Sequence, residues 1–353
     1  MMTKPLIYDL SLEELTQVMQ AWGEPSYRVL QIWQGLYQQY WSSPDDFSNL
    51  PKTLREKVMD HFSFSHLTIV REVCSNDGFT VKTLFDINTS SGIEAVLMHY
   101  PQTSDKKSER NTLCISTQVG CAMGCVFCAT GQMGFQQNLT SGEIVEQVLF
   151  YARQLGARSK RVSNVVVMGM GEPFHNYEQT LGAIERLNHS QGFNLGARRF
   201  TISTVGLVPF IKRFSNERLQ ANLAISLHAA DNDLRSSMLP INNKYPLEQL
   251  IPACHDYVDK THRRITFEWA LIKDVNDSIE DARKLRGLLN GLLCHVNIIP
   301  LNPTNGYTGA PTSNARALAF QSTLQRYNIP CTIRTRRGIE IQAGCGQLAT
   351  EGI

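Results

Sequence analysis

The sequence predicts an α/β fold: a partial β/α barrel, with an N-terminal helical domain and a small antiparallel sheet. Apolar residues recur at helical spacing over about the first sixty residues, and short strand patterns follow in residues 64–100. After residue 110, short apolar strands alternate with longer helical stretches, which favours a parallel sheet curled into a full or partial barrel. We therefore expect three units: residues 1–62, 63–105 and 106–353.

The first unit carries the signals of short helices. Ser11 and Glu14 form a capping-box pattern, in which each side chain bonds the other residue's backbone N–H. Residues 15–22 follow this pattern, and residues 27–41 carry apolar side chains at helical spacing. These segments predict a small helical domain.

The second unit shows short strands. Strand patterns occupy residues 66–73, 79–87 and 92–100, and the turn sequences SNDG and NTSSG separate them. Short strands joined by tight turns predict a small antiparallel sheet.

The third unit alternates strands with helices. Helical patterns such as residues 141–154 and 176–189 lie between several of its strands. Functional residues of β/α barrels gather at the carboxyl ends of the strands, so polar residues there are candidate site residues. The predicted strands are residues 113–117, 164–169, 198–204, 221–229, 265–272, 295–301 and 331–335.

The composition is that of an ordinary globular protein. Hydrophobic residues make up 42% and charged residues 19% of the 353 residues, which argues against extensive disorder. No apolar run approaches the length of about 18 residues that a membrane span needs, and the N-terminus lacks the apolar core of a signal peptide. We expect a cytoplasmic protein with no membrane partner, whose nine cysteines are thiols, metal ligands or catalytic groups.

Basic residues gather locally although the net charge is only +2. Such clusters suit a polyanion if they share a face, and solvated surface charge is the alternative for each of them. The clusters are Lys106 and Lys107 with Arg110, residues 158–161, Arg198 with Arg199, Lys212 with Arg213, Arg263 with Arg264, and residues 334–337.

Three cysteines follow the first predicted barrel strand. Cys121, Cys125 and Cys128 have the spacing C-x3-C-x2-C, and neither cysteine nor histidine occurs in the next forty residues. Structural zinc takes four protein ligands, so a zinc site would need a distant fourth ligand, and the local acid–base motif of zinc deaminases is absent. A 4Fe–4S cluster held by three thiolates leaves one iron open to a non-protein ligand. The spacing favours a cluster, with zinc as the alternative.

The motifs together resemble the RlmN/Cfr family of radical S-adenosylmethionine (SAM) RNA adenine methyltransferases. The resemblance covers nearly the whole chain, including the N-terminal helices, and is nearest to the RlmN-type members. Residues 121–128 alone would identify only the superfamily. The motifs are TLCISTQVGCAMGCVFCATGQMGFQQNLTSGEIVEQV, MGMGEPFHN, RRFTISTVGLVP, LAISLHAADNDLRSSMLPIN, NIIPLNP and IEIQAGCGQLA.

The resemblance implies roles for three residues outside the cysteine loop. Cys345 matches the cysteine that carries the methyl group as S-methylcysteine, and Cys114 matches the one that releases it through a transient disulfide. Glu94 matches the proton acceptor near the substrate. Gly344 and Gln342 depart from the alanine and aspartate that are common in the family, close to Cys345.

The resemblance also implies the cofactors and their ligands. Cys121, Cys125 and Cys128 would hold three irons of a 4Fe–4S cluster, and SAM would occupy the fourth. The implied SAM-binding residues lie near the ends of predicted strands: Gly171, Glu172, Ser203, Ser226, Leu227, His228 and Asn302.

The implied activity is that of a SAM-dependent methyltransferase of EC class 2.1.1, which uses two SAM per turnover. The expected target is C2 of an adenine in the peptidyl-transferase region of 23S rRNA, before full ribosome assembly, and the adenine next to the tRNA anticodon. Methylation at C8 of the same rRNA adenine, as in Cfr-like members, is the alternative, and a non-catalytic zinc-containing RNA-binding module is the alternative from another class. The expected partners are these RNAs and an electron donor such as flavodoxin, and we expect a monomer.

Overall fold

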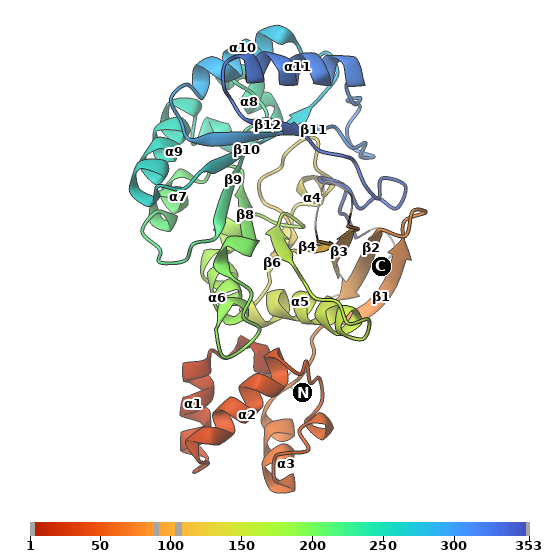
Figure 1. Ribbon diagram of the computed structural model, residues 1–353, viewed down its shortest axis with the longest axis vertical. Coiled ribbons are helices and arrows are strands. Elements are labelled where there is room, and N and C mark those ends of the chain that lie inside the picture. Colours follow the sequence, from red (N-terminus) through yellow and green to blue (C-terminus); the bar gives the residue numbers. More distant parts are fainter. Residues whose placement is uncertain (1–3, 88–91, 103–107, 351–353) are drawn as a thin grey trace.

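A ten-stranded sheet forms the centre of the computed structural model, which describes residues 4–87, 92–102 and 108–350 (Figure 1). Strands β1 to β4 pair antiparallel, and from β4 onward neighbouring strands are parallel. The predicted α/β fold is thus confirmed, with its antiparallel part joined edge to edge to its parallel part. In spatial order the strands are β1 (Thr68–Cys74), β2 (Thr80–Asp86), β3 (Gly92–Tyr100), β4 (Arg110–Cys114), β7 (Asn164–Val167), β8 (Phe200–Thr204), β9 (Asn222–Ser226), β10 (Ile265–Leu271), β11 (Cys294–Pro300) and β12 (Cys331–Ile333).

Each of these strands corresponds to a predicted one. The turn sequence SNDG joins β1 to β2, whereas residues 88–91 of the second predicted turn lie outside the described residues. Parallel strands present all their carboxyl ends at one edge of the sheet and all their amino ends at the other. The sheet therefore has two functionally different edges.

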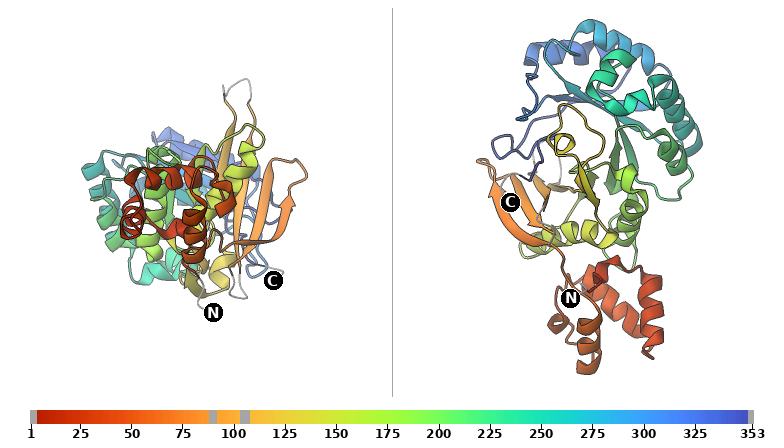
Figure 2. Two further views of the ribbon diagram at one scale, coloured as in Figure 1. Left: turned by 90° about the horizontal axis from the view of Figure 1, so that it is seen from below. Right: turned by 180° about the vertical axis from the view of Figure 1, so that it is seen from behind.

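Helices cover the outer face of the parallel part of the sheet (Figures 1 and 2). Capping boxes begin α5 at Thr140 and α10 at Ser278. Large side chains such as Phe200, Phe214 and Trp269 are fully buried between the layers, and each contributes about 1.5–3 kcal/mol through its burial. The helices are α5 (Ser141–Gly156), α6 (Tyr177–Asn188), α7 (Val208–Phe214), α8 (Asn232–Met238), α9 (Leu247–Thr261), α10 (Ile279–Leu288) and α11 (Asn314–Arg326).

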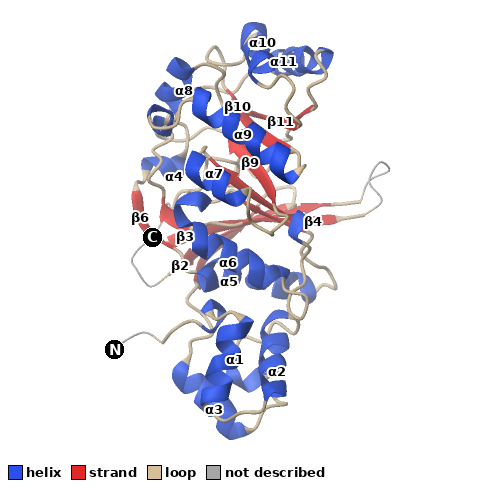
Figure 3. Cartoon of the chain, turned by 90° about the vertical axis from the view of Figure 1, so that its left-hand side faces the viewer, coloured by secondary structure: helices blue, strands red, loops and turns tan. Residues whose placement is uncertain are grey.

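The N-terminal helices form a small unit below α5 and α6 (Figure 3). They are α1 (Leu12–Ala21), α2 (Ser26–Tyr37) and α3 (Lys52–His61), and the predicted capping box of Ser11 and Glu14 is present. Tyr8 and Trp33 are buried in the core of this unit. A Cβ at Gly35 would lie 2.2 Å from the ring of Trp41, so this helix position accepts only glycine.

Hydrogen bonds fasten the helical unit to the barrel. The Asp9 carboxylate accepts from the backbone N–H of Gly142 at 2.7 Å, in the first turn of α5, where the helix dipole favours negative charge. At the next turn, the buried carboxylate of Glu146 accepts from the backbone N–H of His66 at 3.0 Å. Helix α5 is therefore one of the elements through which the two parts meet.

A two-stranded ribbon flanks the cysteine loop and has no counterpart in the sequence predictions. It consists of β5 (Gln118–Gly120) and β6 (Phe135–Asn138). Strands of three and four residues are too short to show a periodic pattern.

Nowhere in the described ranges does a helix combine the length and the apolar character that crossing a bilayer requires.

Candidate active site

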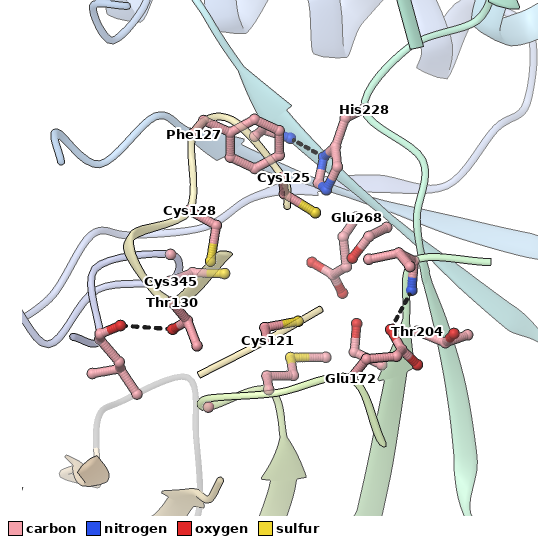
Figure 4. Close-up of a pocket in the computed structure, with 18 of the residues that line it drawn as sticks. Cys121, Cys125, Phe127, Cys128, Thr130, Glu172, Thr204, His228, Glu268 and Cys345 are labelled. Carbon is pink, nitrogen blue, oxygen red and sulfur yellow. Dashed lines mark hydrogen bonds between the residues drawn. The ribbon is translucent and has the colours of Figure 1, made fainter. Parts of the chain in front are cut away.

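A cavity opens at the carboxyl edge of the parallel sheet (Figure 4). Residues at or just beyond the ends of five neighbouring strands, β7 to β11, line it together with the cysteine loop and the C-terminal segment. The lining residues discussed below are Cys121, Cys125, Phe127, Cys128, Gly171, Glu172, Ser203, Ser226, His228, Glu268, Ala270, Asn302, Cys345 and Gly346. Most of the predicted site residues are thus brought to one place.

The three motif cysteines lie between β5 and the short helix α4 (Ala129–Gln132), with their sulfur atoms toward the cavity (Figure 4). Gly120 has a φ of +66°, and a Cβ there would lie 1.7 Å from the carbonyl oxygen of Gly134. The backbone N–H of Cys121 donates to the same carbonyl at 3.0 Å. The tight ribbon therefore fixes the position from which the cysteine loop begins.

The three thiols suit the ligand set of a 4Fe–4S cluster. Across the described ranges, no three His, Cys, Asp or Glu side chains are arranged to hold one metal ion. Thiolates of a 4Fe–4S cluster each bind a different iron and need not converge on one point. Burial raises the pKa of Cys121 to about 12 and that of Cys125 well above its ordinary value. Such thiols give up their protons to a strong positive charge, which the irons of a cluster supply.

Gly171 and Glu172 form a tight turn beyond β7. Gly171 has a φ of +100°, and a Cβ there would lie 2.6 Å from the Cβ of Gln118. The buried Glu172 carboxylate accepts from the backbone N–H groups of Phe174 at 3.0 Å and Val205 at 2.9 Å. Burial still raises the pKa of Glu172 to about 7. An ammonium group in the cavity would keep this carboxylate ionised, as the amino group of SAM requires.

The ends of β8 and β9 contribute Ser203, Ser226 and His228 to the wall of the cavity. Leu227 does not line it: its side chain is fully buried, and its backbone N–H donates to the carbonyl oxygen of Glu268 at 3.1 Å. Leu227 is therefore the one predicted SAM-binding residue that does not line the cavity. Its side chain packs in the core beyond the end of β9.

His228 is a neutral, buried histidine. Its Nδ1 accepts a hydrogen bond from the backbone N–H of Ala270 at 2.9 Å, which leaves the proton on Nε2. The ring packs edge-on against Phe127 of the cysteine loop, with 5.0 Å between ring centroids. Burial lowers the pKa of His228 to about 3, and the positive charge of Arg235 lowers it further. The uncharged His228 ring therefore has a fixed position between the cysteine loop and β10.

Two buried oxygen atoms of the cavity wall lack a hydrogen-bond partner within the described structure: Oε2 of Glu268 and Oδ1 of Asn302. Glu268 Oε2 lies 4.0 Å from Nη1 of Arg334, the other Glu268 oxygen accepts from Asn297 at 2.9 Å, and burial raises the pKa of Glu268. A buried acceptor without a hydrogen bond costs about 1–3 kcal/mol, which a ligand that donates hydrogen bonds would recover. The ammonium, hydroxyl and amino groups of SAM are such donors, so these atoms fit SAM in the cavity.

Cys345 lies in a C-terminal segment that closes one side of the cavity (Figure 4). Asn302 donates from Nδ2 to the carbonyl oxygen of Cys345 at 3.0 Å. A Cβ at Gly344 would lie 2.7 Å from that same nitrogen, so the alanine that is common here in the family would require the Asn302 amide to shift. The Cys345 side chain is solvent-exposed, and it reaches the cavity that the three loop cysteines share.

The same segment is tied to the cysteine loop and to β3. Ala129 donates its backbone N–H to the carbonyl oxygen of Gly346 at 2.8 Å, and Thr130 donates its hydroxyl to that of Leu348 at 2.6 Å. Farther on, the backbone N–H of Ala349 donates to Glu94 Oε2 at 2.9 Å. The C-terminal segment is thus held at three places: by Asn302, by the start of α4 and by Glu94 of β3.

Cys114 ends β4 and does not line the cavity. Burial raises the pKa of its thiol to about 12, and the nearby thiol of Cys345 raises it further, whereas Arg334 lowers it. The two thiols are free, and that of Cys345 lies close enough to raise the pKa of Cys114, although the two residues are far apart in the sequence.

Glu94 faces a second hollow, which is lined on one side by Glu340 and Gln342 of the C-terminal segment. Its carboxylate is buried, and Oε1 pairs with Lys82 Nζ at 2.7 Å. The hollow of Glu94 and the cavity of Cys345 are thus lined by one segment of the chain.

Comparison with known proteins agrees with this site. The model of the radical SAM superfamily matches residues 115–285, and that of the ribosomal RNA large subunit methyltransferase N-terminal domain matches residues 7–63. A probable dual-specificity RNA methyltransferase RlmN of Chloroflexus aurantiacus is 46% identical, over 99% of this chain and 93% of the relative. The dual-specificity RNA methyltransferase RlmN 1 of Myxococcus xanthus is 45% identical, over 98% of this chain and 94% of the relative. The chain belongs to the RlmN family of radical SAM RNA methyltransferases.

A solved structure supports the same family. A radical SAM methyltransferase from Sphaerobacter thermophilus superposes with a TM-score of 0.94 at 49% identity, and the match covers 98% of this chain and 100% of that one. Membership of the radical SAM superfamily implies a 4Fe–4S cluster and SAM. The predicted resemblance to the RlmN/Cfr family is thus confirmed, and as a member of that family the chain is a SAM-dependent RNA methyltransferase of EC class 2.1.1.

Three residues near the RlmN-family site were not found by sequence reasoning. Glu268 lines the cavity, Lys82 pairs with Glu94, and Arg334 lies near both Cys114 and Cys345. Glu268 did leave a signal, because it is a lone charged residue in the apolar strand ITFEWALI. Lys82 and Arg334 each have polar neighbours in the sequence, so the sequence alone does not distinguish them from ordinary surface charges.

Proposed function

We propose that this protein methylates C2 of a specific adenine in 23S rRNA and of the adenine next to the anticodon in tRNA. The methyl group would travel through an S-methylcysteine at Cys345, with two SAM consumed per turnover. The relatives from Chloroflexus aurantiacus and Myxococcus xanthus are named as dual-specificity RNA methyltransferases, which supports two kinds of RNA substrate.

One observation carries this proposal: Cys345 lines the same cavity as Cys121, Cys125 and Cys128. A cysteine without a role in binding the cluster has no structural need to approach the cluster ligands. Its position on a segment tied down by Asn302 and Ala129 supports a role in which the Cys345 thiol accepts a methyl group from a bound SAM. This juxtaposition favours a carrier role for Cys345.

The chain has residues suited to each cofactor. Cys121, Cys125 and Cys128 would hold three irons of the cluster, while Glu172, Ser203, Ser226, Glu268 and Asn302 would surround SAM. When it is bound and reduced, the cluster supplies the single electron that cleaves SAM and so opens a radical route to an unreactive ring carbon. Backbone bonds to Glu172 and Asn302 keep their carboxylate and amide oriented before SAM arrives.

The remaining chemistry falls to three side chains. Cys345 accepts a methyl group on its sulfur, and after one hydrogen atom has been removed from that methyl group its carbon bonds to the adenine ring. Glu94 accepts the proton lost from the ring, and the single electron left on the ring would return to the cluster. Cys114 then attacks the Cys345 sulfur: a disulfide forms, the sulfur–carbon bond breaks, and the carbon leaves with the electron pair and takes up a proton. The disulfide must be reduced by an external thiol before the next turnover.

Lys82 suits Glu94 to this task. A buried carboxylate without a counter-ion tends to hold its proton, whereas the ammonium of Lys82 at 2.7 Å favours the ionised form that accepts one. The Glu94 hollow and the Cys345 cavity share the C-terminal segment, so we infer that this segment shifts when the base enters. The same shift would move Cys345 from the position in which it accepts the methyl group to the position in which it donates that carbon.

The proposed partners follow from this chemistry. The target adenine has to be turned out of its stack to enter the cavity, which favours 23S rRNA that is not yet fully assembled into the ribosome. One-electron chemistry requires a donor such as flavodoxin. We propose that the enzyme works as a monomer, in the cytoplasm where its RNA substrates are.

The position of the methyl group tests the proposal. Ribosomal RNA and tRNA treated with the reconstituted enzyme would be digested separately and their nucleosides identified by mass spectrometry. We expect 2-methyladenosine in both. Finding 8-methyladenosine without the 2-methyl isomer would overturn the C2 assignment in favour of the Cfr-like activity. One zinc per chain, with neither iron nor SAM cleavage after anaerobic purification, would support the non-catalytic alternative.

A further inference from the structure

An open, basic groove lies at the amino edge of the parallel sheet, opposite to the edge that carries the cavity. It has a volume of about 970 Å³, which is at the upper end of ordinary small-molecule sites. We call it the amino-edge groove. Its cationic lining residues are Arg110, Lys160, Arg161 and Arg199, and its aromatic ones are Tyr40, Tyr100 and Phe193.

The cations of the groove come from the starts of three neighbouring strands. Arg110 is the first residue of β4, Lys160 and Arg161 precede β7, and Arg199 precedes β8. In Figure 3, the β4 side of the sheet extends above α2 of the helical unit. Neighbouring strands are about 4.8 Å apart, so the cations form a row along the edge of the sheet and do not surround one point.

The charge of this row is largely uncompensated. Glu109 is the only acidic residue that lines the described groove, and it pairs with Lys160 at 3.0 Å. Arg110, Arg161 and Arg199 are exposed, and no carboxylate in the described ranges lies within ion-pair distance of them. Arg199 also lines an adjoining hollow with Arg198 and Arg218, and no acidic residue lines that hollow. The row of positive charge thus continues across a second depression.

The groove is partly preorganised by aromatic contacts. The ring of Tyr100 has the guanidinium of Arg110 at 4.4 Å from its centroid and that of Arg337 at 4.7 Å. Tyr40 from the helical unit packs against Phe193 of the barrel, with 6.0 Å between centroids. Both parts of the protein therefore supply its walls, and the rings hold at least one cation in place.

We propose that the amino-edge groove binds the sugar–phosphate backbone of the RNA substrate, outside the target nucleotide. An exposed row of cations on separate strands suits successive phosphates of a chain, whereas a small phosphate compound is held by converging, buried donors. Strands of four or five residues separate the groove from the cavity by roughly 15 Å or more. RNA in the groove is therefore RNA that flanks the flipped adenine. This inference rests on the RNA substrate of the proposed function and assigns a second contact to it.

The test compares two RNAs and two triple variants of the full-length protein. The groove variant is Arg110→Gln, Arg161→Gln and Arg199→Gln. The matched control removes three positive charges from exposed residues of α10 and α11, as Arg283→Gln, Lys284→Gln and Arg326→Gln, at the far end of the molecule (Figure 1). One RNA is a short hairpin with the target loop, and the other extends the same hairpin through its neighbouring helices.

We expect the groove variant to bind the extended RNA roughly 10- to 100-fold more weakly, with a log–log salt slope shallower by about 2, while its affinity for the short hairpin and the control's affinity for both RNAs stay unchanged. A second groove variant with lysine at all three positions should retain the slope, because it keeps the charge. An unchanged slope for the extended RNA, an equal loss for both RNAs, or an equal loss in the control would overturn the proposal.

Methylation of the RNA is measured separately from RNA binding. If the wild-type enzyme binds the extended RNA with the expected salt slope but forms no 2-methyladenosine, the proposed function fails and the groove stands. If 2-methyladenosine forms and the groove variant binds like the wild type, the groove fails and the proposed function stands. Matching thermal midpoints for wild type and variants exclude misfolding as the cause of a binding loss.

Discussion

Asn302 joins the cavity to the segment that carries Cys345. Its Nδ2 donates to the Cys345 carbonyl oxygen at 3.0 Å, while its Oδ1 is a buried acceptor without a partner in the described structure, on the wall of the cavity. One amide group thus faces the expected SAM on one side and positions Cys345, the proposed methyl carrier, on the other. The binding of SAM and the placement of Cys345 are therefore linked through a single side chain.

Replacing Asn302 with alanine should affect both functions. We expect SAM to bind about tenfold more weakly, because one buried hydrogen bond to the ligand is worth about 1–1.5 kcal/mol. Methylation of Cys345 should slow by at least as much. The measurements are anaerobic equilibrium dialysis with SAM and mass spectrometry of the peptide that contains Cys345.

Gln347→Ala is the matched control for Asn302. Gln347 also steadies the segment, accepting from the backbone N–H of Gly344 at 3.1 Å and donating to Pro303 at 2.8 Å, but it does not line the cavity. It should slow the methylation of Cys345 and leave SAM affinity unchanged. If both variants lower SAM affinity equally, Asn302 acts only by holding the segment.

Glu268→Gln should weaken SAM binding. Glu268 Oε2 accepts no hydrogen bond within the described structure and is expected to accept from SAM, so its loss should reduce affinity by roughly 5- to 160-fold, the equivalent of about 1–3 kcal/mol. The thermal midpoint should fall, because the substitution removes the carboxylate that pairs with Arg334 at 4.0 Å. Glu146→Gln changes a buried carboxyl group remote from the cavity and should not alter SAM affinity. Unchanged affinity of Glu268→Gln would remove Glu268 from the SAM site.

Gly171→Ala should disrupt the turn that presents Glu172. The φ of +100° and the 2.6 Å approach to Gln118 leave no room for a Cβ. We expect an unfolding free energy lower by about 1–3 kcal/mol and a marked loss of SAM binding. Gly287→Ala lies in α10 with nothing within 4 Å of the added Cβ, so it should be neutral or stabilising by about 0.5–1 kcal/mol. Calorimetry of the two variants measures both effects, and equal midpoints would contradict the proposed strain.

His228 should contribute a loss of stability as the pH falls below neutral, while Glu172, whose pKa is raised to about 7 in the folded protein, contributes in the opposite sense. The pKa of His228 is about 3 in the folded protein and about 6.5 when unfolded, so the unfolded state binds a proton first and gains in stability as the pH falls. Between pH 7.5 and 5.5 the loss from this residue is about 1.4 kcal/mol. His228→Gln should remove that part of the pH dependence. Denaturant unfolding of both proteins at the two pH values checks this, and parallel pH profiles would show that His228 titrates in the folded state.

The sequence predicts the strands and most of the cavity because both follow local rules. Short apolar strands between helices indicate a parallel sheet, and the ends of such strands converge, so Glu172, Ser203, Ser226 and Asn302 share one site. The burial of Leu227 away from the cavity depends on how far β9 extends, which is not encoded locally. The ion pair of Glu94 with Lys82 depends on the register of β2 against β3, and the amino-edge groove depends on three connections that meet only in the folded protein.

The most direct test of the account is the fate of RNA on the Cys114→Ala variant. If Cys345 carries the methyl carbon and Cys114 releases it, this variant should accumulate RNA joined covalently through one carbon to the peptide that contains Cys345, as mass spectrometry of the digested complex would show. Cys254→Ala changes a buried cysteine that does not line the cavity, and it should turn over without an adduct. Normal methylation by Cys114→Ala with no adduct, or an adduct on any cysteine other than Cys345, would contradict the central claim.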